Sequence, residues 1–186
     1  MKVLVSDSLA EEGVKRLQSG AEVDVITNLS PEELVEKIKN YDALVIRSGT
    51  KVTADVIKAA DRLKVIGRAG VGIDNVDVEA ATKKGIIVLN TPGGNTISAA
   101  EHTIAMMLAL ARNIPQANSA LHSGEWNRKK YTGVEFFNKT LGVVGLGRVG
   151  AEVAARMKSF GMQILAYDPF VTEERAQQMG ITLADL

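Results

Sequence analysis

Residues 140–169 read TLGVVGLGRVGAEVAARMKSFGMQILAYDP. An apolar run leads into glycines at the spacing GxGxxG, an alanine-rich segment of helical character follows, and a second apolar run ends at Asp168. This order predicts a strand, a glycine turn, a helix and a second, parallel strand. Such a unit belongs in a parallel sheet whose faces are covered by helices.

Each glycine of the turn has a separate physical role. Gly145 permits a tight turn out of the strand, Gly147 allows a pyrophosphate to approach the backbone, and Gly150 allows the helix and the strand to pack closely. The free N–H groups and the positive dipole end of the helix then face the phosphates. The pattern predicts a dinucleotide site. The alternative is an α/β crossover whose glycines serve packing only.

Asp168 stands at the end of the second strand, where a carboxylate can accept hydrogen bonds from both hydroxyl groups of an adenosine ribose. A carboxylate at this position repels a 2′-phosphate group. We therefore expect NAD as the cofactor, in preference to NADP.

The composition is that of an ordinary globular chain of 186 residues, with 46% hydrophobic residues and 22 residues of each charge. This length suits one large or two small domains. With no net charge and no long basic run beyond 128–130, we expect neither a nucleic-acid nor a membrane partner. The absence of cysteine excludes disulfides, a thiol nucleophile and cysteine metal sites, and no other metal-ligand spacing is present.

The N-terminus leads at once into the strand-like residues 3–5, which leaves no room for a signal peptide. The most apolar helical segment, 97–112, contains Glu101 and His102 and is too short and polar to span a bilayer. The absence of cysteine fits a reducing compartment. A cytoplasmic location is therefore expected.

The first half of the chain alternates short apolar runs with amphipathic stretches. We expect strands at 2–7, 21–27, 42–47, 64–67 and 86–89, and helices at 9–17, 30–38, 54–60 and 78–83. Such alternation predicts a doubly wound parallel sheet. Residues 90–95, NTPGGN, contain a proline and two glycines that cannot extend a strand or a helix. These residues indicate a domain boundary, which predicts one domain at 1–92 and a second at 93–186.

The second domain is expected to open with helical residues 97–112 and a second helix that ends near Ser123. Irregular residues then lead to the strand, turn, helix and strand described above, and a further helix at 172–179 and a short strand at 181–183 follow. A complete dinucleotide-binding domain of this type has about six strands. The sequence therefore predicts an incomplete domain.

An incomplete sheet leaves apolar side chains without cover. Val143, Leu165 and the helical residues 106–110 are expected to be among them. Open apolar patches and unpaired strand edges drive association. We therefore expect a homo-oligomer.

Five stretches of the chain resemble the D-isomer-specific 2-hydroxyacid dehydrogenases. They are VIRSGTKVTADVI (45–57), GRAGVGIDNVDVEAA (67–81), NTPGGNTISAAEHT (90–103), ALARNIPQA (109–117) and FFNKTLGVVGLGRVGAEVAARMKSFGMQILAYDP (136–169). The resemblance implies an α/β fold in which a flavodoxin-like, doubly wound substrate domain is followed by a Rossmann dinucleotide-binding domain, incomplete in this chain. It also implies NAD as the cofactor and a small-molecule substrate.

The resemblance assigns substrate-binding roles to the ends of two strands in the first domain and to one basic residue of the second. These residues are Arg47, Ser48, Arg68, Gly70, Val71 and Arg128. The implied cofactor-binding residues are Val71, Gly145, Gly147, Arg148, Val149, Gly150, Asp168 and Pro169. Ligands of open α/β sheets bind outside the carboxyl ends of strands, and arginine forks suit anionic substrates. The alternatives are a surface ion pair for Arg47 and a solvated basic run for Arg128.

The implied activity is the NAD-dependent oxidation of 3-phosphoglycerate to 3-phosphohydroxypyruvate in serine biosynthesis, or that of another D-2-hydroxyacid dehydrogenase of the glyoxylate/hydroxypyruvate reductase type. In the family an Arg, a Glu and a His perform the chemistry, and this chain contains none of these three positions. Its only histidines, His102 and His122, are expected to be structural. We therefore assign no catalytic residue and expect the chain alone to be inactive. The alternatives are a non-catalytic NAD- or anion-binding fragment and a fragment that serves only assembly.

Overall fold

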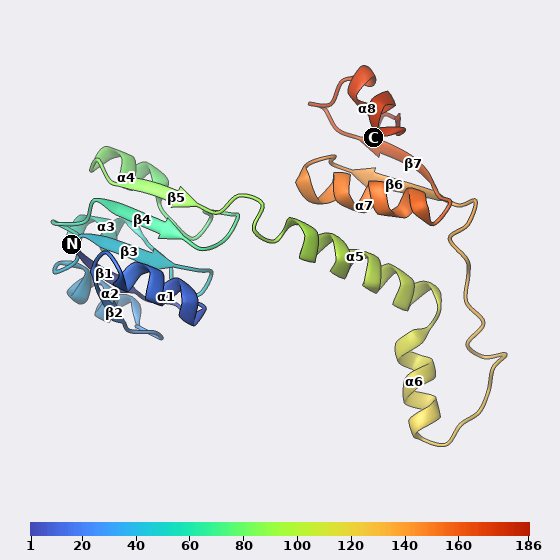
Figure 1. Ribbon diagram of the computed structural model, residues 1–186, viewed down its shortest axis with the longest axis horizontal. Coiled ribbons are helices and arrows are strands. Elements are labelled where there is room, and N and C mark those ends of the chain that lie inside the picture. Colours follow the sequence, from blue (N-terminus) through green and yellow to red (C-terminus); the bar gives the residue numbers. More distant parts are fainter. The chain divides into compact units, whose positions relative to one another are not determined.

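The computed structural model describes residues 1–186 and divides into two compact units, Met1–Gly94 and Asn95–Leu186. Each unit has its own parallel sheet (Figure 1). None of the helices combines the length and the apolar character that crossing a bilayer requires.

The first unit is a five-stranded parallel sheet with four helices. Its elements are β1 (Lys2–Val5), α1 (Glu11–Gln18), β2 (Glu22–Val25), α2 (Pro31–Ile38), β3 (Ala43–Ile46), α3 (Ala54–Ala59), β4 (Val65–Arg68), α4 (Val78–Lys83) and β5 (Ile87–Asn90). The strand order β2-β1-β3-β4-β5 is that of flavodoxin-like sheets. The expected α/β fold is confirmed for this unit.

The start of α2 shows how local sequence sets the boundary of an element. The Ser30 hydroxyl accepts a hydrogen bond from the Glu33 amide at 3.2 Å, and the Glu33 carboxylate accepts one from the Ser30 amide at 2.8 Å. Pro31 follows the cap, at a position where its missing N–H leaves no hydrogen bond unmade.

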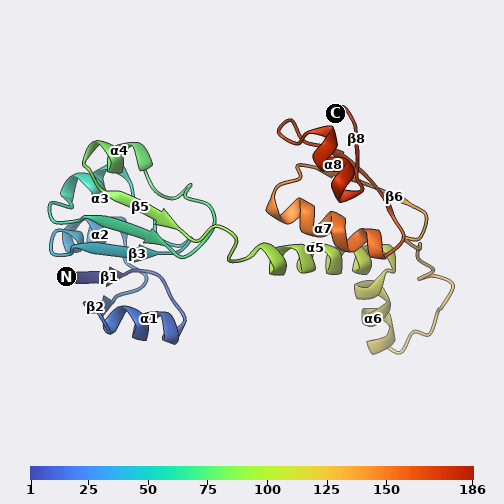
Figure 2. The same ribbon diagram turned by 45° about the horizontal axis from the view of Figure 1, so that its top comes forward.

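Helices cover the two faces of this sheet unequally, with α1 on one side and α2 and α3 on the other (Figure 2). The larger core lies under α2 and α3, where Leu34, Ile38 and Ile57 pack against the strands. On the side of α1 the cover is incomplete, because Ile87 and Leu89 of β5 are 60% and 56% exposed.

The second unit combines a three-stranded parallel sheet with four helices. Its elements are α5 (Thr96–Ala111), α6 (Ile114–His122), β6 (Thr140–Val144), α7 (Arg148–Ser159), β7 (Gln163–Tyr167), α8 (Glu173–Met179) and β8 (Thr182–Leu183). The strand order β6-β7-β8 matches the first half of a Rossmann sheet. α5 runs alongside α7 in both views, and Ile104 of α5 shares a core with Val153 of α7 (Figures 1 and 2).

Only one face of the second sheet is covered. Val143 packs partly into the core, whereas its neighbour Val144 is 75% exposed. The expectation that Val143 is left open is therefore wrong, because side chains of a strand alternate between faces and a shift of one residue reverses the face. Leu165 is 39% exposed, as expected. Of the helical residues 106–110, Met106 and Leu110 are 61% and 76% exposed, whereas Met107 and Leu108 pack partly against the core, so that expectation holds only in part.

The connection between α6 and β6 contains no helix or strand, as expected, but it is fixed to the end of α5. The Val134 amide donates to the Ala111 carbonyl at 2.9 Å. A Cβ on Gly133 would run into the same carbonyl oxygen and lie 2.8 Å from the Cα of Arg112. Glycine is therefore needed at 133 because two backbone segments meet there.

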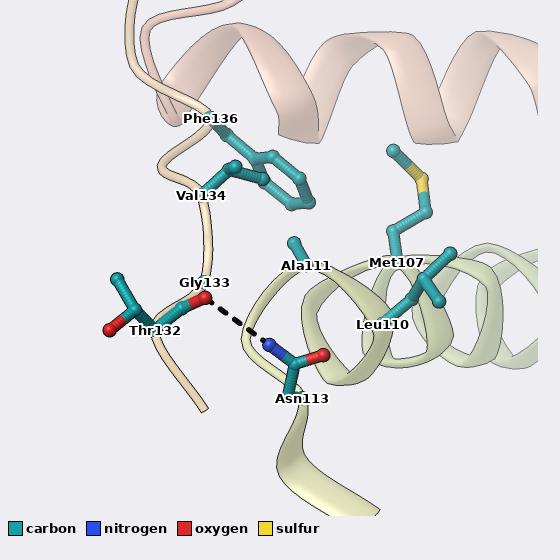
Figure 3. A pocket seen from close by; sticks show the side chains of 8 residues that line it. All are labelled: Met107, Leu110, Ala111, Asn113, Thr132, Gly133, Val134 and Phe136. Carbon is teal, nitrogen blue, oxygen red and sulfur yellow. Dashed lines mark hydrogen bonds between the residues drawn. The ribbon is translucent and has the colours of Figure 1, made fainter. Parts of the chain in front are cut away.

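An apolar recess of about 500 Å³ lies beside this contact (Figure 3). Its lining residues are Met107, Leu110, Ala111, Asn113, Thr132, Gly133, Val134 and Phe136. The Asn113 side chain donates to the Thr132 carbonyl at 3.4 Å, as the dashed line in Figure 3 marks. The recess contains none of the residues expected to bind substrate or cofactor.

Candidate functional site

The three glycines of the turn between β6 and α7 differ in what their positions require. Gly145 has a φ of +93°, which side chains with a Cβ rarely adopt. A Cβ on Gly150 would run into the carbonyl oxygen of Gly145, so the helix and the turn are in direct backbone contact. A Cβ on Gly147 would meet no atom within 4 Å. The fold itself therefore requires Gly145 and Gly150, whereas the space over Gly147 is open to a ligand.

α7 begins directly after this turn, with Gly147 as its N-cap. No side chain caps the first amide groups of the helix, and its first turn contains no acidic residue. Arg148 is exposed at the start of the helix, and Val149 packs partly into the core. Free amide groups at the positive end of a helix dipole suit a phosphate group.

Asp168 links the end of β7 to the glycine turn. Its Oδ2 accepts a hydrogen bond from the Leu146 amide at 2.7 Å, and its Oδ1 accepts one from the Phe170 amide at 2.9 Å. The backbone strengthens this link, since the Gly145 amide donates to the Tyr167 carbonyl at 2.7 Å. A carboxylate has about four acceptor positions, so the Asp168 oxygens can also accept from the hydroxyl groups of a ligand.

These features fit the adenosine and pyrophosphate half of a dinucleotide. The space over Gly147 admits a phosphate, the first amides of α7 are donors, and Asp168 is an acceptor with Pro169 exposed beside it. The structure therefore brings together the cofactor-binding residues that were expected around the turn. Val71, the remaining expected cofactor residue, belongs to the first unit.

The residues expected to bind substrate in the first unit follow two neighbouring strands. β3 and β4 pair in parallel and end at paired residues, so the loops after them begin side by side at the carboxyl edge of the sheet. The first loop contains Arg47 and Ser48, and the second, which starts after Arg68, contains Gly70 and Val71. The carboxyl edge of an open α/β sheet is where ligands bind.

Arg47 extends from the first loop with an exposed side chain. Its guanidinium forms one long hydrogen bond, from Nη1 to the Ser8 carbonyl at 3.4 Å, and no ion pair. The surface ion pair considered as an alternative is therefore not formed. The charged group is free to contact an anion at the sheet edge.

Arg68, expected to bind substrate, has its guanidinium engaged by its own loop. Its side chain is only 11% exposed, Nη1 donates to the Gly72 carbonyl, and Nη2 lies 4.0 Å from the Asp74 carboxylate. Nε is buried without a partner. A Cβ on Gly70 would lie 3.3 Å from Nη1, so the loop wraps closely around the guanidinium. Acceptors in its own loop turn the side chain inward. The identity of residue 68 alone does not predict these acceptors.

Three polar residues that the sequence reasoning missed hold these loops in place. Asp7, which follows β1, accepts hydrogen bonds from amides of the first loop. Asn75 donates from the second loop to carbonyl groups of the first. Asn90, the last residue of β5, donates to the Val71 carbonyl at 2.6 Å. Asp7 and Asn90 were detectable in principle, because each is a polar residue at or just beyond the carboxyl end of a strand.

The remaining residues singled out by sequence lie in the second unit. Arg128 is exposed in the connection between α6 and β6, where it lines a small recess with Trp126 and Tyr131. His102 is exposed on α5, and His122 is the exposed last residue of α6. No hydrogen bond with a carboxylate orients either imidazole.

Most of the displaced pKa values belong to residues at the amino edge of the first sheet, outside both candidate sites. The Lys2 ammonium lies 3.1 Å from the Asp24 carboxylate, to which Tyr41 donates its hydroxyl at 2.7 Å. Burial, and then this hydrogen bond, raises the pKa of Tyr41 to about 12. Hydrogen bonds from Tyr41 and Lys2 hold the pKa of Asp24 below its usual value. This network joins β1, β2 and the turn that leads into β3, so it supports the sheet.

Known proteins resemble the chain throughout its length. It is 58% identical over 185 residues to D-3-phosphoglycerate dehydrogenase of Methanocaldococcus jannaschii, and the match covers 100% of this chain but 35% of that protein. The chain therefore spans little more than a third of the length of this curated relative.

Solved structures share the fold. The crystal structure of the TT0316 protein from Thermus thermophilus superposes with a TM-score of 0.87 at 33% identity, over 99% of this chain and 60% of that one. D-lactate dehydrogenase from Aquifex aeolicus, solved in complex with NAD and lactic acid, gives a TM-score of 0.85 at 26% identity, over 99% of this chain and 56% of that one.

A sequence profile of the D-isomer specific 2-hydroxyacid dehydrogenase catalytic domain matches residues 3–185. This match extends over both units, including the glycine turn and both loops at the carboxyl edge of the first sheet. The chain therefore belongs to the D-isomer specific 2-hydroxyacid dehydrogenase family.

Proposed function

We propose that this chain supplies the substrate-binding and NAD-binding parts of a D-3-phosphoglycerate dehydrogenase. That reaction transfers a hydride from C2 of 3-phosphoglycerate to NAD⁺ and releases the proton of the 2-hydroxyl, giving 3-phosphohydroxypyruvate and NADH. The observation that carries the proposal is the glycine turn braced by Asp168. It occurs in a chain that is 58% identical, over its whole length, to an enzyme of that name.

The adenosine half of NAD is assigned to the second unit. Its pyrophosphate occupies the open space over Gly147, near the uncapped amides that begin with Arg148 and Val149. Its ribose hydroxyls donate to Asp168, whose negative charge disfavours the 2′-phosphate of NADP. Pro169 borders this site.

The substrate is assigned to the carboxyl edge of the first sheet. 3-Phosphoglycerate has two anionic ends, and the two loops offer the exposed guanidinium of Arg47 beside Ser48 and the backbone of Gly70 and Val71. Arginine binds carboxylate and phosphate groups through paired N–H donors. Arg68 shapes the second loop and reaches an anion directly only if it leaves its present partner, the Gly72 carbonyl.

The acid–base group of the reaction is not assigned to these residues. A positioned histidine typically contributes about 10² to 10⁴ in rate. His102 and His122 are exposed on helices of the second unit and have no carboxylate to orient them. We therefore assign binding to this chain and expect negligible turnover from the 186 residues alone.

A homo-oligomer and a cytoplasmic location are part of the same proposal. Leu110 of α5 and Leu121 of α6 are 76% and 57% exposed, and Trp126 is 75% exposed. Leu121 and Trp126 line one recess, and exposed apolar side chains of this size favour association. Arg128 lies within this region, where a second copy can reach it. A chain without cysteine is compatible with a reducing compartment. A monomeric mass by light scattering would contradict the oligomer.

The experiment that tests the function is calorimetric titration of NAD, and separately of ADP-ribose, into the purified chain, combined with an assay for NADH formation from 3-phosphoglycerate. The expected result is binding of both nucleotides without turnover. Failure of both to bind would reject the dinucleotide site, and rapid NADH formation would reject the assignment of binding alone. Titration of 3-phosphoglycerate against D-lactate and D-glycerate decides between the proposed substrate and those of other family members.

A further inference from the structure

The loop after β3, Arg47–Thr50, is held at both ends by two side chains, Asp7 just after β1 and Asn75 in the connection between β4 and α4. Asp7 Oδ2 accepts hydrogen bonds from the Arg47 amide at 2.6 Å and from the Thr50 amide at 3.1 Å. Asn75 Nδ2 donates to the Arg47 carbonyl at 2.7 Å and to the Thr50 carbonyl at 2.6 Å. One carboxylate therefore holds the two N–H groups, and one amide holds the two carbonyl groups, of the first and last residues of the loop.

The backbone N–H groups of the two residues between these anchors have no hydrogen-bond acceptor. The amides of Ser48 and Gly49 donate to no acceptor in the protein, whereas those of Arg47 and Thr50 are both engaged. A Cβ on Gly49 would lie 2.6 Å from Asp7 Oδ1, so a side chain at 49 would displace the Asp7 carboxylate. Consecutive free N–H groups in a tight turn can bind an anion.

The Asn75 side chain uses both of its N–H groups as donors but leaves its oxygen without a partner. Its two N–H bonds match the two carbonyl acceptors, while its Oδ1 is buried and has no partner. An unsatisfied buried acceptor is unfavourable. A residue used only to fill this space would not carry that cost. The arrangement therefore indicates that holding the Arg47–Thr50 loop is the role of Asn75.

We propose that Asp7 and Asn75 are positioning residues, which hold the Arg47–Thr50 loop so that the Arg47 guanidinium and the free amides of Ser48 and Gly49 face one anionic group of the substrate. This inference rests on the proposed assignment of substrate to the carboxyl edge of the first sheet. Donors held in place before the ligand arrives bind it more tightly, because less conformational freedom is lost on binding.

Amide hydrogen exchange measured by NMR on the ¹⁵N-labelled chain tests the clamp itself. We expect slow exchange at Arg47 and Thr50 and fast exchange at Ser48 and Gly49, because only the first two amides have acceptors. Asn75→Ala and Asp7→Ala are expected to remove this contrast. Asn40→Ala is the matched control, since Asn40 is an exposed asparagine of the same unit whose side chain makes no hydrogen bond.

Titration of 3-phosphoglycerate, and of inorganic phosphate, followed by the amide signals of Ser48 and Gly49, tests the positioning role. We expect Asn75→Ala and Asp7→Ala to weaken binding about tenfold or more, which corresponds to the loss of two hydrogen bonds of ordinary strength. Asp7→Asn, which keeps a carbonyl oxygen as acceptor, should bind within about threefold of the wild type. A role in folding alone would lower thermal stability without this selective recovery.

Two outcomes overturn the inference, and they are distinguishable. If Asn75→Ala and Asp7→Ala leave both the exchange pattern and the affinity unchanged, the clamp has no positioning role, although the substrate site stands. If the wild type shows the exchange contrast but neither anion shifts the Ser48 and Gly49 signals, the proposed substrate site fails and the positioning role fails with it. Gly49→Ala provides a second variant, because it displaces Asp7 without deleting a polar group and should reproduce the effect of Asp7→Ala.

Discussion

The Asp168 carboxylate accepts a 2.7 Å hydrogen bond from the backbone amide of Leu146. Leu146 lies between the first two glycines of the turn, and its side chain is only 7% exposed. The bond therefore joins the end of β7 to the turn that begins α7. Asp168 thus holds the shape of the glycine turn, in addition to any contact with a ribose.

Replacement of Asp168 by alanine should weaken binding of ADP-ribose by about tenfold to a hundredfold. Hydrogen bonds to a charged group are worth about 1.5–3 kcal/mol, and about 1.4 kcal/mol is a factor of ten. Isothermal titration calorimetry measures the change. Asp185→Ala, which removes an exposed carboxylate of the same unit, should bind like the wild type. Equal affinities for wild type and Asp168→Ala would remove Asp168 from the site.

Gly147→Ala should separate nucleotide binding from stability. A methyl group at this position meets no protein atom within 4 Å, and the φ of −62° is ordinary for alanine. The thermal unfolding midpoint should therefore stay close to that of the wild type, while the methyl group occupies the space assigned to the pyrophosphate and lowers the affinity for ADP-ribose. Scanning calorimetry tests the unfolding midpoint, and titration calorimetry on the same preparation tests the affinity for ADP-ribose. Undiminished nucleotide affinity would show that no phosphate approaches Gly147.

Gly150→Ala should destabilise the second unit by about 1–3 kcal/mol, the usual cost of overpacking. The added methyl group would run into the Gly145 carbonyl, which is backbone and cannot move aside easily. Urea unfolding followed by circular dichroism measures the loss. Gly142→Ala is the control, because a Cβ there has no neighbour within 4 Å and the change should stay within about 0.5 kcal/mol. A Gly150→Ala variant as stable as the control would contradict the close contact.

Alkaline pH should destabilise the first unit through Tyr41. Its pKa is raised to about 12 in the folded state, against 10.0 for the unfolded chain. Below pH 10 both states keep the proton, and between pH 10 and 12 only the unfolded state loses it, so stability falls across that window. The thermal unfolding midpoint measured from pH 9 to 12 should decline less steeply in Tyr41→Phe. An identical slope in both proteins would show that Tyr41 does not contribute.

The order of strands and helices could be read from the sequence because its signals are local. The alternation of apolar runs with amphipathic stretches, the cap at Ser30 and the breaker residues 90–95 each act within a few residues. The glycine turn was predictable for the same reason, since its three glycines and Asp168 lie within one strand–helix–strand unit.

The direction in which individual side chains point could be predicted less well from the sequence. The exposed face of β6 was assigned to Val143 and belongs to Val144, because strand alternation gives two faces without naming the covered one. The sequence did not predict that the Arg68 guanidinium lies inside a loop whose Gly72 carbonyl and Asp74 carboxylate provide the nearest acceptors. Both outcomes depend on which surfaces meet in the folded chain.

The sequence by itself determined the elements, the two parallel sheets and the positions of the glycine turn and of the loops after β3 and β4, since these follow from residue patterns of short range. Only the tertiary structure decided how the loops are held. Asp7 reaches Arg47 across 40 residues, and Asn75 reaches it across 28. Those bonds exist because the sheet places β3 between β1 and β4, so that three distant segments end at one edge. Contacts of this kind are a property of strand order, which no local pattern of residues encodes.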